Sequence, residues 1–327
     1  MFAYSTAMSL DNIELIFSWY LIYFLIIKVV NNEKRFFIFL LLYFLFNFKM
    51  SQHGFISWAT NGFSFRTWGA TGAPGWFHNS GEFGIEMCIF IPLLICFMAS
   101  IRKNINNLRY AILIIVLITA LGSIVASSSR GAVLGLAAMG IYAILKSKLS
   151  IKVVLAISLI SIVSIYFMPA EFIQRFIEMG EDKSSVSRLT YWKAGIDMLK
   201  DNPVFGIGYN NWMLYYEKYY AIGGRVQLPH NVFIQAASEL GLAGLFGFVL
   251  MIIYSLIINM RTRKISILNS NNFIYWMSHG FDIALVGMLT SGFFVTVLYY
   301  PFFWIYISFV VALNNVATKD NVVAEVA

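Results

Sequence analysis

The stretch RVQLPHNVFIQAASELGLAGLFGFV, residues 225–249, passes from polar chain into a long apolar helix. Because proline does not fit inside a helix, we expect the helix to begin near His230, directly after Pro229. Three polar residues then follow at intervals of four, Asn231, Gln235 and Glu239, so they share one stripe of the helix. A polar stripe on so apolar a helix has to face a protein interior or a water-filled cleft.

The rest of the chain repeats this apolar character. Its 327 residues are 59% hydrophobic and only 12% charged, and the mean hydropathy is +0.73. A soluble domain carries about 25% charged residues. The apolar residues come in long runs and lack the alternation of a transmembrane β-barrel. The sequence therefore predicts an all-α polytopic membrane protein.

Nine apolar runs are candidates for membrane spans. They cover roughly residues 13–30, 36–50, 83–100, 110–127, 131–146, 151–168, 231–260, 273–298 and 301–315. The second and fifth runs are shorter than the ~20 residues that cross a bilayer, so their limits are the least defined. We expect about nine transmembrane helices in one transmembrane domain, residues 1–327.

Basic residues gather in every second connection between these runs. They are Lys28, Lys34 and Arg35, then Arg102, Lys103 and Arg109, then Lys146, Lys148 and Lys152, and finally Arg261, Arg263 and Lys264. By the positive-inside rule these connections are cytoplasmic, and the N-terminus lies outside with residues 51–82, 127–131 and 169–230. The net charge of +7 thus reflects topology, and no nucleic-acid partner is predicted. An outside start without a signal peptide leads us to expect that some N-terminal helices are missing here.

The outer segment 169–230 is predicted to hold ordered amphipathic helices. Its seven acidic and seven basic residues cancel. In SRLTYWKAGIDMLK, residues 187–200, four apolar side chains fall on one helical face: Leu189, Trp192, Ile196 and Leu199. The following DNPVFGIGY, residues 201–209, ends that helix with Asn-Pro and two glycines. We expect this segment to lie on the outer face of the membrane, placed to roof a cavity.

Metal and disulfide chemistry find no support in the sequence. Cys88 and Cys96 fall in one predicted helix, about 12 Å apart along its axis, which is too far for a disulfide. Neither a CxxC nor an HxxxH spacing occurs. We therefore predict no metal and no cofactor, and both cysteines are expected in the core.

Three arginines on the predicted outer side are candidates for binding an anion. Arg130 follows three serines at the end of a span, and it either snorkels to lipid phosphate or joins an anion site with the hydroxyl groups and a helix N-terminus. Arg188 is either a solvated surface residue, stacked on neighbouring aromatic rings, or a second anion ligand. Arg225 lies five residues before His230.

His230 is the candidate for proton transfer. The positive end of the helix that it opens disfavours imidazolium, which keeps the ring neutral and able to accept a proton. The alternative is a hydrogen-bonded structural histidine.

The stretch GWFHNSGEFGIEM, residues 75–87, carries further polar candidates, which are His78, Asn79, Glu82 and Glu86. They either bind polar groups of a substrate or serve the N-terminus of the third span, where carboxylates suit the helix dipole.

Three motifs in this order resemble the O-antigen ligase and polysaccharide polymerase superfamily of bacterial membrane proteins. They are SSSRG at 127–131, SRLTYW and DNPVFGIGY within 187–209, and PHNVFIQAASELGLAGL at 229–245. The resemblance covers about residues 120–260. The stretch WGATGAPGWFHNSGEFGIEM, residues 68–87, looks like the subgroup found with exopolysaccharide and exosortase clusters.

The resemblance implies a fold like that of GT-C glycosyltransferases, with a large helical extracytoplasmic loop. It also implies glycan transfer from undecaprenyl diphosphate to an acceptor hydroxyl on the extracytoplasmic face of the bacterial inner membrane, in O-antigen or exopolysaccharide biosynthesis. The acceptor is a saccharide, a lipid or a protein, so ligase and polymerase both stay open. The paired arginines of the family correspond to Arg130 and Arg188, and its essential histidine to His230.

The expected reaction is a metal-independent, inverting glycosyl transfer. Arg130 and Arg188, with Arg225, would bind the diphosphate, and His230 would act as base. A transporter of a small anion or saccharide is the alternative, but neither internal repeats nor broken helices in matching halves are apparent in the sequence.

The three residues are expected to converge on one outer cavity. Arg130 and His230 should then lie on the order of 10 Å apart. Gln235, Glu239 and Asn231 would line its deeper wall, and the acceptor side would open toward residues 51–82. Gly241, Gly244 and Gly247 would allow the fourth and seventh helices to pack closely.

Overall fold

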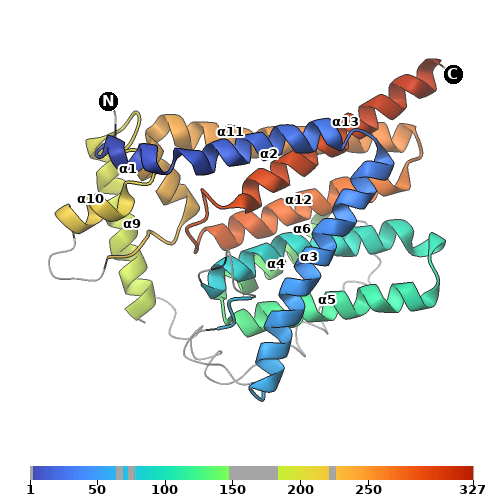
Figure 1. The fold of residues 1–327 in the computed structure, drawn as a ribbon, viewed down its shortest axis with the longest axis horizontal. Coiled ribbons are helices and arrows are strands. Elements are labelled where there is room, and N and C mark those ends of the chain that lie inside the picture. Colours follow the sequence, from blue (N-terminus) through green and yellow to red (C-terminus); the bar gives the residue numbers. More distant parts are fainter. Residues whose placement is uncertain are drawn as a thin grey trace. The chain divides into compact units, whose positions relative to one another are not determined.

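The computed structural model describes residues 3–63, 69–72, 77, 79–146, 183–220 and 226–326 (Figure 1). These residues form helices and turns, without a strand, which confirms the all-helical prediction. The chain divides into two compact units. The first comprises Met1–Leu40, Lys183–Ser278 and Gly292–Ala327, and the second comprises Leu41–Asp182 and His279–Ser291. The assignment of residues 1–327 to one domain stays a prediction.

The first unit is built around the long helix α11. Its whole helices are α1 (Thr6–Asp11), α2 (Ile13–Val29), α9 (Lys183–Asp201), α10 (Trp212–Tyr219), α11 (Val232–Leu268) and α13 (Pro301–Val326). Helix α11 packs against α9, α10 and α13, and α13 packs against α2. The short helix α9 runs across the end of the unit at which α11 begins (Figure 1).

The second unit surrounds α4 (Ser80–Ile101), whose side chains are almost all buried. Helix α4 packs against α5 (Asn107–Ser127) and α6 (Arg130–Lys146). Both predicted core cysteines, Cys88 and Cys96, are free thiols buried in α4, as expected.

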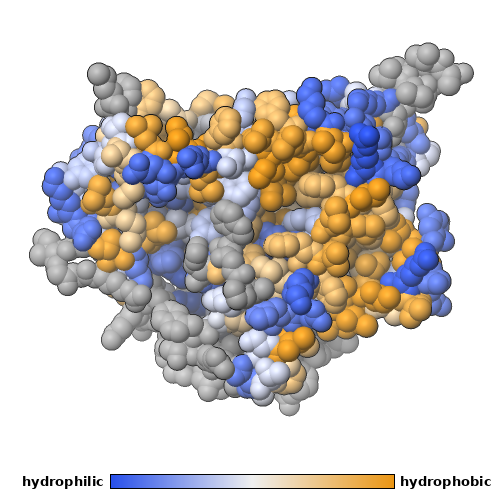
Figure 2. All heavy atoms as spheres, in the orientation of Figure 1, coloured by the Kyte–Doolittle hydropathy of each residue, from blue (hydrophilic) through white to orange (hydrophobic). Residues whose placement is uncertain are grey.

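Among the residues that the structure describes, six helical segments are long and apolar enough to cross a membrane. They are Thr6–Val29, Glu33–Thr60, Ser80–Asn104, Asn107–Ser127, Val232–Leu268 and Pro301–Lys319. Helices α6 and α12 (Asn272–Gly292) form where spans were predicted but are not among the six. The predicted span 151–168 lies outside the described residues, so nine spans are not confirmed. Apolar side chains cover much of the surface over α2 and α5, as expected for contact with lipid (Figure 2).

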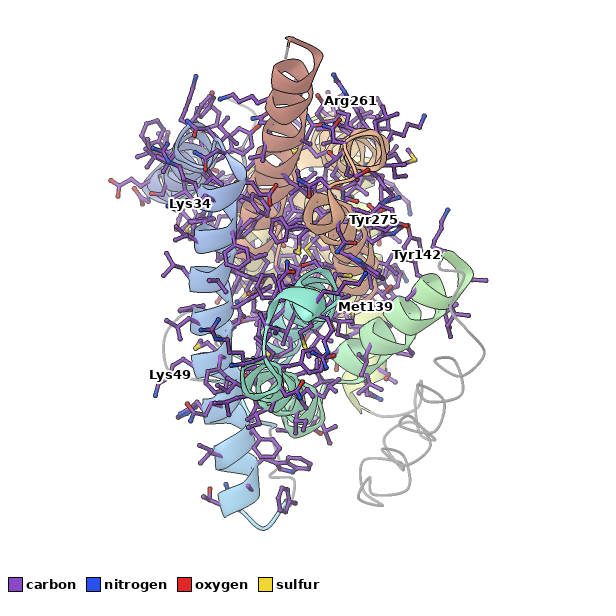
Figure 3. The ribbon with its side chains drawn as sticks, turned by 90° about the vertical axis from the view of Figure 1, so that its right-hand side faces the viewer. Lys34, Lys49, Met139, Tyr142, Arg261 and Tyr275 are labelled. Atoms are coloured by element: carbon purple, nitrogen blue, oxygen red, sulfur yellow. The ribbon has the colours of Figure 1, made fainter. Side chains whose placement is uncertain are left out.

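The two ends of the first unit agree with the predicted alternation of loops. At one end, the Asn271 side chain donates a hydrogen bond to the Glu33 carboxylate at 2.6 Å. The basic residues that flank these positions therefore share an end, and Lys34 and Arg261 mark it in Figure 3. At the other end, the backbone N–H of Tyr4 donates to the carbonyl of Ile207 at 2.7 Å. The N-terminal segment and the loop between α9 and α10 thus lie together.

The second predicted span, 36–50, was too short. Helix α3 runs from Glu33 to Thr60, ten residues further. Polar residues of the added turns are buried against α5, because the Ser51 hydroxyl lies 3.1 Å from that of Thr119 and the Ser51 carbonyl accepts from Ser123 at 2.7 Å. These partners remove the cost of burying polar side chains, which hydropathy alone does not reveal.

The predicted span 231–260 is not one continuous helix. Gly241 takes φ 67° and ψ −167°, which breaks α11 in its first third. Residues 203–208 lie against the break. The N–H groups of Leu242 and Ala243 donate to the carbonyls of Pro203 and Val204, and the N–H groups of Ile207 and Gly208 donate to the carbonyls of Ser238 and Glu239. These four hydrogen bonds replace helical ones that the break removes.

Gly241, Gly244 and Gly247 were expected to allow close helix packing, but they do not all have this role. Gly241 faces the carbonyl of Val204 and the N–H of Gly206, whereas no atom would lie within 4 Å of a side chain added at Gly247. A Cβ at Gly244 would meet the Leu240 side chain of its own helix. The break at Gly241, and not helix–helix contact, accounts for this glycine.

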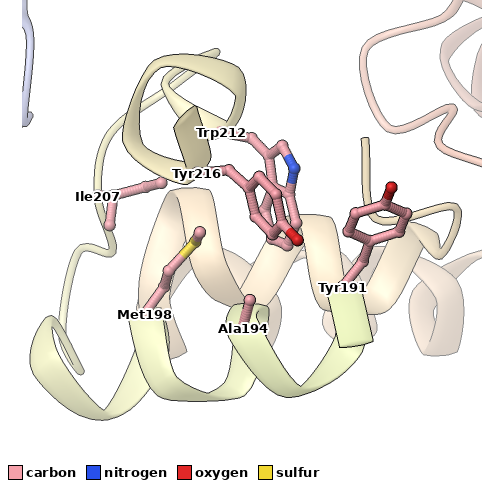
Figure 4. Packing of buried hydrophobic residues seen from close by; sticks show 6 residues of the cluster. All are labelled: Tyr191, Ala194, Met198, Ile207, Trp212 and Tyr216. Atoms are coloured by element: carbon pink, nitrogen blue, oxygen red, sulfur yellow. The ribbon is translucent and has the colours of Figure 1, made fainter. Parts of the chain in front are cut away.

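Helix α9 buries a face made of Tyr191, Ala194 and Met198. These residues pack with Ile207, Trp212 and Tyr216, and the Trp212 and Tyr216 rings stack with centroids 5.9 Å apart (Figure 4). Of the amphipathic face predicted from the sequence, Leu189 and Ile196 stay exposed. Helix α9 is therefore held through its aromatic side, and a second apolar face is left outward.

Candidate functional site

Three consecutive residues, Pro229, His230 and Asn231, form a sharply bent entry to α11. His230 has φ +49°, in the left-handed region that few residues other than glycine adopt. Asn231 is the N-cap of α11, and its side chain accepts hydrogen bonds from the N–H groups of Phe233 and Ile234 at 2.9 and 3.1 Å. The helix begins at Val232, two residues after the predicted point, and His230 directly precedes its N-cap.

The backbone around His230 is fixed by two further elements. The indole N–H of Trp192, on α9, donates to the carbonyl of Pro229 at 2.9 Å. The N–H of His230 itself donates to the hydroxyl of Thr296 at 2.7 Å. Arg188 lies one helical turn before Trp192, so this contact holds the part of α9 that carries the arginine beside the turn of His230.

The His230 ring is held neutral. Burial and the positive charge of Arg188 lower its pKa from 6.5 to about 4. A neutral imidazole at neutral pH was expected, and this direction is confirmed. The causes are burial and the nearby arginine, whereas the sequence argument had relied on the helix N-terminus.

The polar stripe of α11 faces the protein interior. Asn231, Gln235 and Glu239 are each less than 5% exposed. Gln235 accepts from the N–H of Leu298 at 3.2 Å and donates to Glu239 at 3.2 Å. The sequence had left two settings open for this stripe, a protein interior and a water-filled cleft, and the described contacts are those of a packed interior. A role for these side chains in substrate binding stays a prediction.

Glu239 has a specific structural task. Its carboxylate accepts from the N–H of Trp212 at 2.9 Å, at the first residue of α10. The N-cap of α10, Asn211, makes no capping bond with its side chain, so Glu239 supplies the acceptor from another helix. A carboxylate at a helix N-terminus is favourable because of the helix dipole. This contact explains why an apolar helix carries a glutamate.

Arg130 belongs to the second unit, at the turn between α5 and α6. Ser128 ends α5 in a left-handed conformation, with φ 52°, and the Ser129 hydroxyl accepts from the N–H of Ala132 at 3.3 Å at the start of α6. Arg130 is the first residue of α6 and is partly buried. Gly69 lies directly against the backbone of Ser127, so residues 69–72 and the SSSRG turn share one end of this unit. A common cavity with His230 stays a prediction.

Asn79 and Glu82 form a capping pair at the start of α4. Asn79 accepts from the N–H of Glu82 at 3.0 Å and donates to the Glu82 carboxylate at 2.5 Å. Further along, Glu86 accepts from the Tyr43 hydroxyl at 2.8 Å. Of the two interpretations of this stretch, the helix-terminal one has direct contacts. His78 and Arg225 lie outside the described residues.

One contributor near His230, Thr296, was not anticipated from the sequence. Thr296 fell inside the predicted span 273–298, but α12 ends at Gly292 and residues 293–300 form a turn segment before α13. Gly292 and Pro301 are the usual helix stop and start signals and could have revealed this segment. Within the described residues, no cluster of His, Cys, Asp and Glu could hold a metal ion.

The fold and this entry turn define a multi-pass helical membrane protein with a neutral histidine at the end of a span. The family model described as O-antigen ligase matches residues 114–249, a range that contains Arg130, Arg188 and His230. This match supports the resemblance to the O-antigen ligase and polysaccharide polymerase superfamily that the motifs predicted. No curated protein matches the sequence significantly.

Proposed function

We propose that this protein transfers a glycan from undecaprenyl diphosphate to an acceptor hydroxyl on the extracytoplasmic face of the bacterial inner membrane. The family match supports a glycan ligase or polymerase. The observation that carries the proposal is the entry turn of α11, where contacts from Trp192 and Thr296 fix the backbone of His230, and where burial and the charge of Arg188 lower the pKa of the ring. Such an imidazole is unprotonated at neutral pH and available as a base.

In the proposed reaction the acceptor oxygen attacks the anomeric carbon while the bond from that carbon to the diphosphate oxygen breaks. The acceptor proton passes to the His230 imidazole. The diphosphate leaves with the bonding electrons, and the new glycosidic bond has inverted configuration. Because the diphosphate is a good leaving group, the reaction does not need a strong general acid. It needs positive charge that compensates the negative charge on the departing diphosphate, and the paired N–H groups of an arginine side chain can bind two of its oxygens at once. The sequence resemblance assigns this binding to Arg130 and Arg188, and Arg225 is a third candidate because of its position five residues before His230.

The decisive experiment is glycan transfer in nanodiscs with a synthetic lipid-linked donor and a saccharide acceptor. We expect His230→Ala to lose about 10²–10⁴-fold in kcat, the range that a general base contributes. Arg188→Lys keeps the charge but not the two-pronged geometry, so it should weaken donor use. Near-wild-type turnover of His230→Ala would refute the base assignment. Analysis of acceptor products distinguishes a ligase from a polymerase.

A transporter is the second candidate, because the break of α11 at Gly241 is of the kind found in transporters. In those proteins the freed backbone groups bind the substrate. Here the N–H groups of Leu242 and Ala243 and the carbonyls of Ser238 and Glu239 are bonded to residues 203–208. This pairing favours a structural break. Flux of labelled saccharide into proteoliposomes, without glycan elongation, would reverse the preference.

A further inference from the structure

The backbone of His230 is in a conformation that its surroundings must enforce. A φ of +49° places the Cβ atom close to the backbone carbonyl and costs free energy in a residue with a side chain. Histidine tolerates this region better than most residues, yet it leaves the region readily unless other contacts hold it. A return to extended backbone would swing the Cα–Cβ bond and carry the imidazole away from its present place.

Thr296 provides the contact that acts on His230 directly. Its hydroxyl accepts the His230 N–H at 2.7 Å, and the threonine is only 5% exposed. A change of φ at His230 would turn the 229–230 peptide, and this N–H with it, relative to α11. Because the segment of Thr296 is itself bonded to α11 through Leu298 and Gln235, the hydrogen bond favours the left-handed conformation. Within this region of the unit, the bond joins two segments 66 residues apart in the sequence.

The segment that carries Thr296 is itself fixed. Leu298 donates its N–H to Gln235 at 3.2 Å, two residues after Thr296 and one turn into α11. On the other side, the ring of Phe293 meets Trp192 edge to face, with centroids 5.2 Å apart, and also contacts Phe233. Residues 293–298 therefore form a strap, held at both ends, with the Thr296 hydroxyl between them.

We propose that Thr296 is a positioning residue for His230, and that its hydroxyl keeps the imidazole oriented for proton transfer by holding the left-handed backbone. The inference rests on the proposed function, since it presumes that the imidazole receives the acceptor proton. Thr296 acts only through His230 and needs no contact with either substrate. A displacement of about 1 Å at a reacting group can cost ~10²-fold in rate, so a small backbone relaxation is enough.

Thr296→Val tests the inference, because valine has nearly the same shape and lacks the acceptor. We expect kcat for glycan transfer to fall about tenfold or more, with the donor KM changed less than about twofold, since only the geometry of the base is altered. Thr296→Ser restores an acceptor oxygen and should recover kcat to within about threefold of wild type. A purely structural role would not produce this rescue together with an unchanged KM.

Thr262→Val is the matched control. Thr262 is also buried, in α11, and its hydroxyl lies within hydrogen-bond distance of the Ile258 carbonyl and the Asn314 side chain, more than 30 residues beyond His230 in the sequence. It should match the stability loss of Thr296→Val without the loss in kcat. If Thr296→Val proves too unstable to assay, Thr296→Ala, which also removes the hydroxyl acceptor, serves in its place.

The two proposals fail in different ways. An active His230→Ala variant would refute the base assignment and the inference with it. An inactive His230→Ala variant beside a Thr296→Val variant of wild-type kcat would refute the inference alone. Equal loss in Thr296→Ser and Thr296→Val would also overturn it, because side-chain shape would then matter and not the acceptor oxygen. In the His230→Ala background, Thr296→Val should cause no further loss.

Discussion

Gly206 and Gly241 cross so closely that a Cβ atom on Gly206 would lie 2.6 Å from the backbone nitrogen of Gly241. Both glycines have φ +67°, so each position also disfavours any side chain for conformational reasons. The crossing joins the loop after α9 to the break in α11. It thereby ties the helix that carries Arg188 to the helix that His230 precedes.

Gly206→Ala and Gly241→Ala should therefore each destabilise the protein, by about 1–3 kcal/mol, the usual cost of overpacking. The thermal midpoint in detergent micelles is the measurement. Gly247→Ala is the control in the same helix, since it has open space around it and should be neutral or stabilise by up to about 1 kcal/mol. Equal midpoints for all three variants would contradict the crossing.

The sequence predicted the helical class and the positions of the described spans because long apolar runs have one main physical meaning in a membrane protein. It could not reveal the break of α11, since the run after Glu239 is equally apolar whether the helix is continuous or interrupted. The partner of the break comes from 203–208, in a segment predicted only to end a helix. Hydropathy also hides Ser51, whose polar groups are satisfied by another helix.

Some of the candidate site residues could be predicted from the sequence, whereas the role of others depends on tertiary packing. His230 and Arg188 could be selected from the motifs, and the electrostatic link between them agrees with that choice. Glu239 was taken as a cavity residue because a buried carboxylate often marks function. Its bond to the N–H of Trp212 depends on tertiary packing across 27 residues, which no local pattern encodes.

Asn79 offers a way to separate capping from substrate binding. Asn79→Ser keeps a side-chain acceptor for the N–H of Glu82, whereas Asn79→Ala removes it, so we expect the alanine variant to lose about 0.5–2 kcal/mol and the serine variant much less. Chemical denaturation measures both. If the serine variant is as stable as wild type but its acceptor KM rises strongly, Asn79 binds substrate as well.

Glu239→Ala should destabilise the packing of α10 on α11 by about 1–3 kcal/mol, because it leaves the buried N–H of Trp212 without its acceptor. Glu239→Gln retains one amide oxygen and should lose less. Fluorescence of the tryptophans during denaturation reports the change. The contact would be unimportant if both substitutions left the unfolding midpoint unaltered.

The low pKa of His230 has a consequence for stability. The unfolded chain binds more protons than the folded protein between about pH 4, the pKa in the folded state, and pH 6.5, the ordinary value. Stability should therefore fall as pH falls through this window. His230→Asn removes the titrating ring and should flatten this part of the profile, which thermal unfolding at a series of pH values can detect.

The charge of Arg188 should also affect how kcat/KM depends on pH, because that charge helps to lower the pKa of His230. Since proton acceptance needs the neutral ring, kcat/KM for wild type should stay level from neutral pH down to about pH 5 and decline only toward pH 4. Arg188→Gln removes the positive charge that helps to lower the pKa, so the decline should begin at a higher pH. Arg188→Lys keeps the charge and should leave the decline where it is in wild type, although both variants lose overall rate because neither has the two-pronged guanidinium group of arginine.

Pre-equilibrated enzyme assayed over pH 4–8 separates the effect on the pH profile from the effect on the overall rate. An unchanged pH profile in Arg188→Gln would show that burial alone sets the pKa of His230, and that Arg188 acts on the substrate without tuning the base.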